Sequence, residues 1–99
     1  MARFDLFENS DGSGFLLDVQ ADLLDALTTR VVVPLLPVAQ IGAVMQQLNP
    51  VFDVEDVPHV MMTQFLAAVP VSELGAKAGT LQAQDTAITN ALDLLLTGV

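Results

Sequence analysis

Apolar and polar residues alternate near the start of the chain, a pattern that is typical of β-strands. Over residues 2–8, Phe4 and Leu6 fall on the same face. The next segment, residues 9–14, reads Asn-Ser-Asp-Gly-Ser-Gly and predicts a tight turn. We therefore expect a second strand, over residues 15–20, that returns antiparallel to the first.

The middle of the chain contains further strand patterns. They cover residues 30–38, 51–54, 60–65 and 67–71. The first of them includes the β-branched run of residues 31–33, which favours a buried strand. Pro34 and Pro37 cannot donate a ladder hydrogen bond, so we expect the second half of this strand at a sheet edge or a bulge. Residues 22–25 predict a short helical or turn connection, and residues 41–48 fit a helix, a loop or a strand.

From Leu81 onward the apolar residues take the spacing of an amphipathic helix. The stripe consists of Leu81, Ala83, Ala87, Ile88, Ala91, Leu92, Leu95 and Leu96. With Thr80 as an N-cap and Gly98 as a C-terminal stop, the pattern predicts a helix over about residues 81–97. Several short strands before one helix predict a mainly β fold, a small antiparallel barrel or sheet with the helix packed against it. A chain of 99 residues is expected to form a single domain, residues 1–99.

The charge balance is strongly acidic and narrows the choice of partners. The chain has twelve Asp and Glu residues against Arg3, Arg30 and Lys77, a net charge of −9. Binding to phosphates requires many Lys and Arg, so nucleic-acid binding by the chain alone is unfavourable, as is docking on an anionic membrane. The charge instead favours a cationic partner or a basic patch on a larger protein.

The sequence offers little for catalysis or metal binding. Cysteine is absent, which excludes disulfides and thiolate chemistry, and a single histidine excludes a His-rich metal site. His59 is interpreted as a surface or capped residue rather than a general base. Asp18, Asp22 and Asp25 match no calcium loop and are interpreted as a solvated acidic face. We therefore expect no catalytic residues, no metal and no cofactor.

Two features bear on localisation and association. The first fifteen residues are charged and do not resemble a secretory signal, and the uncharged run over residues 31–52 is interrupted by prolines and amides. Both predict a cytoplasmic protein. Because 53% of the residues are hydrophobic, we also expect another copy or a partner to cover part of the apolar surface.

Three apolar segments are candidates for such contacts. Leu23 and Leu24 lie between two aspartates, which suits a basic partner if the leucines are exposed. Residues 94–99 end the chain without polar side chains beyond Thr97, so we expect them to be buried in this fold or in another protein. Residues 61–62, both Met, fit the core or a soft subunit contact. The residues alone thus predict an interaction protein with an acidic, partly apolar surface.

Several blocks resemble the CcdB family, the toxins of CcdA–CcdB toxin–antitoxin modules, in the same order along almost the whole chain. They are Phe15-Leu-Leu-Asp-Val-Gln-Ala-Asp-Leu-Leu-Asp25, Arg30-Val-Val-Val-Pro-Leu35, Met61-Met-Thr63, Val69-Pro-Val-Ser72, Ile88-Thr-Asn-Ala-Leu-Asp93 and Gly98-Val99. The resemblance implies an SH3-like barrel of the CcdB and MazF toxin fold, with an added small antiparallel sheet and a C-terminal helix. It also implies a homodimer without enzymatic activity.

Members of this family bind the A subunit of DNA gyrase and trap the enzyme on cleaved DNA. The CcdA antitoxin neutralises them, and the toxin–antitoxin complex represses its own operon. Carried over by position, the gyrase-binding residues of this chain are Leu23, Leu24, Asp93, Leu96, Thr97, Gly98 and Val99. Thr97 stands where the family has Trp, and Asp93 stands where it has Asn.

These two departures leave alternatives open. One is a diverged homologue that no longer poisons gyrase and acts as an antitoxin partner or corepressor. Another is an endoribonuclease of the MazF type, which shares the barrel fold but needs cationic groups to hold RNA. Only Arg3, Arg30 and Lys77 are present for that purpose.

Overall fold

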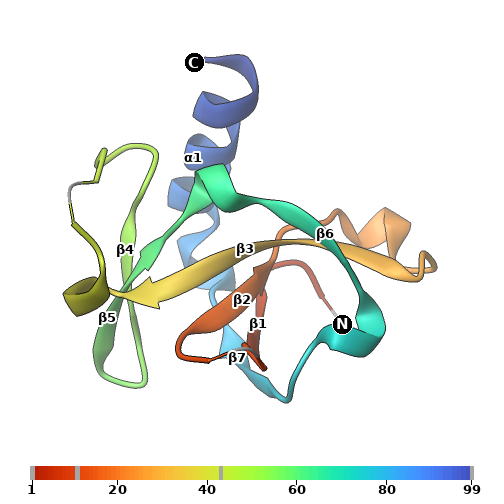
Figure 1. Cartoon of the computed structure of the whole chain (residues 1–99). Helices are drawn as coiled ribbons and strands as arrows, with labels where there is room; N and C mark the ends of the chain where they lie inside the picture. Colours follow the sequence, from red (N-terminus) through yellow and green to blue (C-terminus); the bar gives the residue numbers. More distant parts are fainter. Residues whose placement is uncertain (1, 11, 43, 99) are drawn as a thin grey trace.

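A computed structural model describes residues 2–10, 12–42 and 44–98 of the chain. Within these ranges the strands are β1 (Asp5–Glu8), β2 (Phe15–Asp18), β3 (Thr29–Pro37), β4 (Val51–Val54), β5 (Val57–Met61), β6 (Ala67–Pro70) and β7 (Lys77–Thr80). They form one antiparallel sheet in the order β4-β5-β3-β2-β1-β7, and β6 pairs with β3 outside this order. Figure 1 shows the sheet curled into a half-barrel with a C-terminal helix, α1 (Asp85–Thr97). The predicted mainly β class is confirmed.

The predicted hairpin at the start of the chain is present, with Leu6 opposite Leu17. The first strand begins at Asp5 rather than at residue 2, because Phe4 has a φ of 72° and interrupts the extended backbone. The Phe4 nitrogen donates a hydrogen bond to the Asp18 carbonyl (2.6 Å), and its carbonyl accepts one from the Leu81 nitrogen (2.8 Å). This residue therefore links the hairpin to the segment that leads into the helix.

Strand β3 lies in the interior of the sheet, so the expectation that its prolines place its second half at an edge or a bulge is wrong. Along one edge β3 pairs with β2. Along its other edge, residues 29–32 pair with β6 and residues 35–37 pair with β5. The Pro34 carbonyl accepts a hydrogen bond from the Met62 nitrogen at 2.9 Å. In an antiparallel strand the N–H and the carbonyl of one residue point to the same neighbouring strand. Pro34, which has no N–H, therefore faces the edge of β3 where pairing with β6 has ended and pairing with β5 has not yet begun.

The other strand predictions are confirmed in part. Strand β4 covers residues 51–54 as expected, β6 ends one residue early, and β5 begins at Val57 and ends at Met61 rather than covering residues 60–65. The end of that pattern forms a 3-10 turn instead, η3 (Thr63–Phe65). Residues 41–42 and 44–48 contain neither helix nor strand. Strand β7, which pairs with β1, was not predicted.

Helix α1 packs its buried face against one side of the sheet. The core consists of Phe4, Leu6, Phe15, Leu17, Val19, Val33, Leu35, Phe52, Val54, Met61, Leu81, Ile88, Ala91 and Leu92. The α-helix begins at Asp85 rather than at Leu81, because residues 82–84 form a 3-10 turn, η5 (Gln82–Gln84). The Gln82 nitrogen donates to the Thr80 hydroxyl at 3.2 Å, but the N-cap position of α1 is Gln84, so the prediction of Thr80 as the N-cap of the helix is wrong. None of the helices that the structure describes has the length and apolar character needed to cross a membrane.

The β4–β5 turn contains a local strain that yields a stability prediction. Glu55 and Asp56 both have positive φ, 53° and 65°, and neither is the glycine that this turn prefers. We expect Asp56→Gly to raise the free energy of unfolding by about 0.5–1 kcal/mol, because glycine adopts this conformation without a Cβ clash. Urea denaturation measures the change. The matched control is Asp53→Gly in extended β4, which should destabilise, and a loss of stability in both variants would contradict the strain argument.

Candidate functional site

The connection between β2 and β3 exposes an apolar pair. It forms a 3-10 turn, η1 (Asp22–Leu24), in which no residue is buried. This confirms the predicted turn and excludes a leucine pair hidden beneath it. Leu23 is 91% exposed and Leu24 is 47% exposed. Two large apolar side chains exposed next to each other make this turn a candidate for contact with a partner.

Hydrogen bonds from both sides hold η1 in place. The buried Gln20 side chain donates through Nε2 to the Leu24 carbonyl (2.9 Å) and accepts at Oε1 from the Val31 nitrogen of β3 (3.0 Å). On the other side, the Arg3 nitrogen donates to Asp22 Oδ1 at 2.7 Å. The exposed leucines are therefore presented on a turn that is tied to the sheet.

Under this turn lies a buried ion pair. Arg30 Nε donates to Asp18 Oδ2 at 2.9 Å, and both side chains have no solvent exposure. Asp18 Oδ1 also accepts a hydrogen bond from the Gln20 nitrogen at 3.0 Å. The interpretation of Asp18 as part of a solvated acidic face is therefore wrong, because the residue is the partner of the buried arginine. Within the described ranges, no group of three or more His, Asp or Glu side chains could hold a metal ion.

Gln20→Ala tests whether this residue anchors η1. The variant loses the hydrogen bonds to Leu24 and Val31, so we expect the free energy of unfolding to fall by about 1–3 kcal/mol. Faster hydrogen exchange at the Val31 amide, measured by nuclear magnetic resonance, would locate the loss. Gln20→Met is the control: it keeps the length of the side chain but loses the same two hydrogen bonds, so a loss close to that of alanine assigns the effect to the hydrogen bonds rather than to packing. Wild-type exchange at Val31 in the alanine variant would contradict the anchoring role.

The last turn of α1 forms the second apolar surface. Ile88, Ala91 and Leu92 are buried, whereas Leu96, farther along the helix, is 71% exposed. In Figure 1 the C-terminal end of the helix projects beyond the sheet. The predicted burial of this end within the fold is therefore wrong for the described residues 95–98, which are all exposed.

Hydrogen bonds within its last turn terminate α1. The Thr97 hydroxyl donates to the Asp93 carbonyl at 2.7 Å. Gly98 has a φ of 80°, and its nitrogen donates to the carbonyls of Asp93 (3.2 Å) and Leu94 (3.0 Å). The predicted glycine stop is confirmed. Val99 lies outside the described residues.

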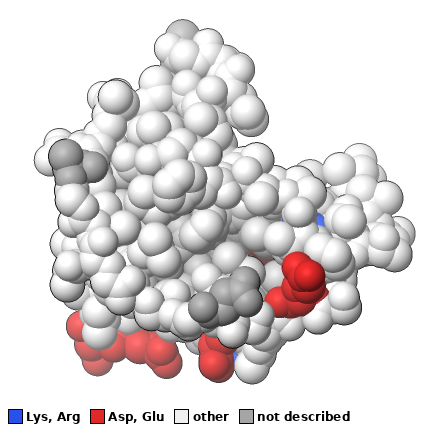
Figure 2. Space-filling view, in the orientation of Figure 1, with Lys and Arg blue, Asp and Glu red and all other residues white. Residues whose placement is uncertain are grey.

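The structure does not bring all the predicted site residues together. Asp93, Leu96, Thr97 and Gly98 share the C-terminal end of α1, whereas Leu23 and Leu24 lie on η1, well apart from it in Figure 1. We call these two groups the helix end and the leucine turn. Figure 2, in the same orientation, shows one face of the projecting helix end, and no charged side chain is visible on that face, although the helix end includes the exposed Asp93. A partner that contacts both surfaces must therefore be large, or must meet more than one copy of the chain.

Sequence reasoning missed two further exposed apolar residues. Phe65 is 56% exposed on η3, a turn that contacts α1. Its pattern predicts a strand that continues through residue 65, whereas β5 ends at Met61 and the 3-10 turn η3 follows it. Met45 is likewise exposed. Both residues add to the exposed apolar side chains of the molecule.

His59 and the two methionines are structural. His59 is buried rather than on the surface, with Nδ1 2.8 Å from the Val57 carbonyl and its ring centroid 5.2 Å from that of Phe15. Met61 and Met62 are buried within the single chain. This agrees with the core interpretation of the methionines rather than with a subunit contact.

Comparison with known proteins identifies the family. Over residues 3–98 the sequence matches the family described as CcdB protein. The fold is similar to that of Mycobacterium tuberculosis toxin MazF-mt6, with a TM-score of 0.73 at 20% identity over 92% of this chain and 93% of that one. It is also similar to an endoribonuclease solved in complex with its cognate antitoxin from a mycobacterial species, with a TM-score of 0.77 at 17% identity over 97% and 94% of the two chains. At such identities the structural likeness shows a shared fold, whereas the sequence match covers nearly the whole chain: the protein belongs to the CcdB family.

Proposed function

We propose that this protein is the toxin of a toxin–antitoxin module and inhibits DNA gyrase by binding its A subunit and trapping the cleaved-DNA complex. The observation that carries the proposal is the apolar helix end, which projects into solvent in a chain of the CcdB family. The leucine turn supplies a second contact. The protein acts by binding and has no catalytic role.

Binding alone is sufficient for such an activity. A protein that binds the cleaved state of an enzyme more tightly than the resealed state shifts the population toward the cleaved state. Leu23 and Leu96 can lose most of their exposed apolar area in a complex, and such buried anchors dominate interface energies. The net charge of −9 favours approach to a basic, DNA-handling enzyme.

The proposal includes a homodimer. Phe65 is exposed on η3, which contacts α1, and Leu95 is exposed on α1 itself, so a second copy that covers both would pack against this helix. A dimer would also present two leucine turns to one target. Sedimentation of the purified chain tests this part directly.

The proposal also includes a CcdA-like antitoxin that neutralises the toxin and, together with it, represses their operon. The acidic charge suits a basic antitoxin. Support comes from the second structural neighbour, which was solved with its own antitoxin.

The test is a gyrase cleavage assay. Purified protein is incubated with gyrase, ATP and supercoiled plasmid, and linear DNA is measured after the enzyme is denatured. We expect linear DNA to increase with the dose of protein, because a trapped cleavage complex releases broken DNA when gyrase unfolds. Absence of linear DNA, with protein shown to be folded, would contradict gyrase poisoning and leave the family assignment intact.

A MazF-type endoribonuclease is the second candidate, and the fold similarity favours it. The cations argue against it, because each is engaged within the chain. Arg30 is buried against Asp18, Lys77 Nζ lies 3.4 Å from Asp5 Oδ2, and Arg3 donates from Nε to the Val19 carbonyl and lies over the Phe4 ring. RNA cleavage by the purified protein, lost on Lys77→Ala or Arg3→Ala, would favour this candidate.

A diverged homologue that binds antitoxin without poisoning gyrase is the third candidate. It is favoured by Thr97, whose hydroxyl is bound to the helix backbone and offers no flat apolar surface. Asp93 adds a charge at the same end. Overproduction without growth arrest, combined with tight antitoxin binding, would distinguish this candidate from a toxin.

A further inference from the structure

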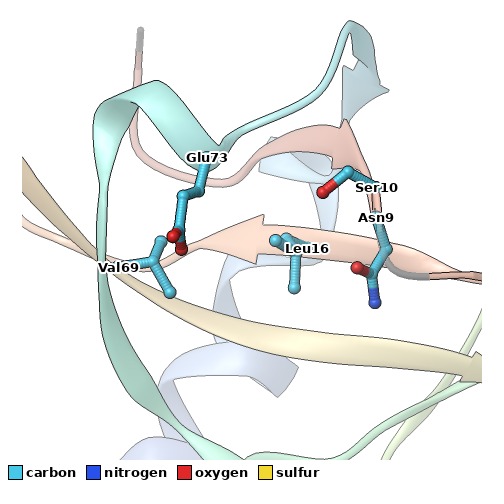
Figure 3. Close-up of a pocket in the computed structure, with 5 residues that line it drawn as sticks. All are labelled: Asn9, Ser10, Leu16, Val69 and Glu73. Carbon is cyan, nitrogen blue, oxygen red and sulfur yellow. The ribbon is translucent and has the colours of Figure 1, made fainter.

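A hollow lies on a part of the molecule that neither the helix end nor the leucine turn occupies. Its volume is about 280 Å³, and it is lined by Asn9, Ser10, Leu16, Val69 and Glu73. Figure 3 shows the Glu73 carboxylate and the Ser10 hydroxyl directed into it from opposite sides, with Leu16 between them. Glu73 belongs to the 3-10 turn η4 (Val71–Glu73), which follows β6.

The sheet register explains why the hollow is partly apolar. Leu16 lies opposite Pro34, and its neighbour Leu17 lies opposite the core residue Val33. Because side chains alternate between the faces of a strand, Leu16 faces away from the helix-covered core. Val69 reaches the same hollow from β6, and both side chains are half-buried.

The carboxylate at the hollow has no cation of its own. Of the three basic side chains, Arg30 is paired with Asp18, and Lys77, the nearest to Glu73 in sequence, is paired with Asp5. Among the described residues no ion pair involves Glu73. With a net charge of −9, the chain has far more carboxylates than basic side chains, which favours a cation supplied by a partner at Glu73.

The chemistry of the lining selects the kind of cation. A divalent metal is held best by several carboxylates, whereas the hollow has a single carboxylate, with one amide, one hydroxyl and the apolar side chains of Leu16 and Val69. Lysine and arginine carry a charged end on an apolar stem, and they bury the stem while the charged end stays near water or an anion. A basic side chain therefore matches both parts of the lining.

We propose that the hollow receives a lysine or arginine side chain of the antitoxin. The alkyl stem lies along Leu16 and Val69, and the charged end meets the Glu73 carboxylate, with the Ser10 hydroxyl as a further acceptor. The inference rests on the proposed function only in taking an antitoxin as the partner. It assigns antitoxin recognition to a surface separate from the two that the proposed function assigns to gyrase.

The experiment measures binding of the antitoxin encoded beside the toxin gene, by isothermal titration calorimetry at two salt concentrations. We expect Glu73→Gln to weaken binding about fivefold to tenfold and to reduce its salt dependence, because the variant loses one charge-assisted contact. Glu73→Lys should weaken binding about a hundredfold through like-charge repulsion. The matched control is Glu55→Gln, which makes the same change in net charge at the distant β4–β5 turn and should change affinity less than twofold.

A small probe makes the test independent of the antitoxin. N-acetyl-arginine amide is titrated into the labelled protein, and the methyl signals of Leu16 and Val69 are followed by nuclear magnetic resonance. We expect these signals to shift with the arginine probe and not with the uncharged N-acetyl-citrulline amide, and the shifts to be lost in Glu73→Gln.

The outcomes separate the inference from the proposed function. If the antitoxin binds Glu73→Gln and Glu55→Gln equally well, and the probe shifts neither methyl signal, the inference is overturned and the proposed function is untouched. If the wild-type protein does not bind the antitoxin, the antitoxin part of the proposed function fails, and the inference fails with it. A shift caused equally by the citrulline probe would also overturn the inference, because the charge would then have no part in binding.

Discussion

Asp18→Ala is expected to lower the free energy of unfolding by about 3–5 kcal/mol, because it leaves the guanidinium of Arg30 buried without a counter-charge. Both side chains are completely inaccessible to solvent, so water cannot replace the carboxylate without local opening. The variant also loses the acceptor of the Gln20 nitrogen, which lies next to the leucine turn. Small domains have a total stability of about 5–15 kcal/mol, so a large part of it is lost. Urea denaturation followed by circular dichroism measures the change.

Two further variants identify the cause. Asp18→Asn keeps an oxygen at the site and removes the charge, so it should destabilise less than alanine. The double variant Asp18→Leu with Arg30→Met removes both charges, and we expect it to recover much of the loss. The loss is recovered because neither terminal nitrogen of Arg30 has a well-formed hydrogen bond among the described residues, although Nη2 is 2.5 Å from Asp18 Oδ2. Replacing Arg30 therefore removes buried donors that are not satisfied in the wild type. If the double variant is as unstable as Asp18→Ala, an unpaired buried charge is not the cause.

The parts of the fold that could be predicted are those decided by neighbouring residues. The β1–β2 hairpin follows from the turn residues between its strands, and the end of α1 follows from Gly98. Strand β7 contains Gly79 and Lys77, which disfavour strands, and it is extended because it pairs with β1. The interior position of β3 also could not be predicted, because Pro34 is tolerated there only where the partner strand changes. Both depend on pairing between distant segments.

The candidate site likewise has one part that neighbouring residues predict and another that depends on distant segments. The exposure of Leu23 and Leu24 could be predicted from the flanking aspartates, since a four-residue acidic turn has little room to bury apolar side chains. Asp18 belongs to the same acidic run, yet it is buried, because the strand register places it within reach of Arg30. The Glu73 hollow has no sequence signal at all. It exists because β6 and η4 lie beside the β1–β2 hairpin, which only the closed curvature of the sheet brings about.

Leu96→Ala is expected to weaken gyrase poisoning without destabilising the protein. An exposed apolar anchor that becomes buried in a complex contributes about 2 kcal/mol or more, so the protein concentration for half-maximal linear DNA should rise about thirtyfold or more. The side chain is 71% exposed in the free chain, and we expect its free energy of unfolding to change by less than about 0.5 kcal/mol. Leu23→Ala should behave in the same way, because Leu23 is even more exposed.

The same helix provides the control. Leu92 lies about one turn before Leu96 but is only 7% exposed, so Leu92→Ala makes the same chemical change in the core. It should lower the free energy of unfolding by about 2–5 kcal/mol. Any loss of poisoning that it causes should be proportional to the unfolded fraction, whereas the loss caused by Leu96→Ala should occur in fully folded protein. If Leu96→Ala and Leu23→Ala both poison gyrase as well as the wild type does, neither apolar surface is the gyrase contact, and the exposed leucines must bind another partner.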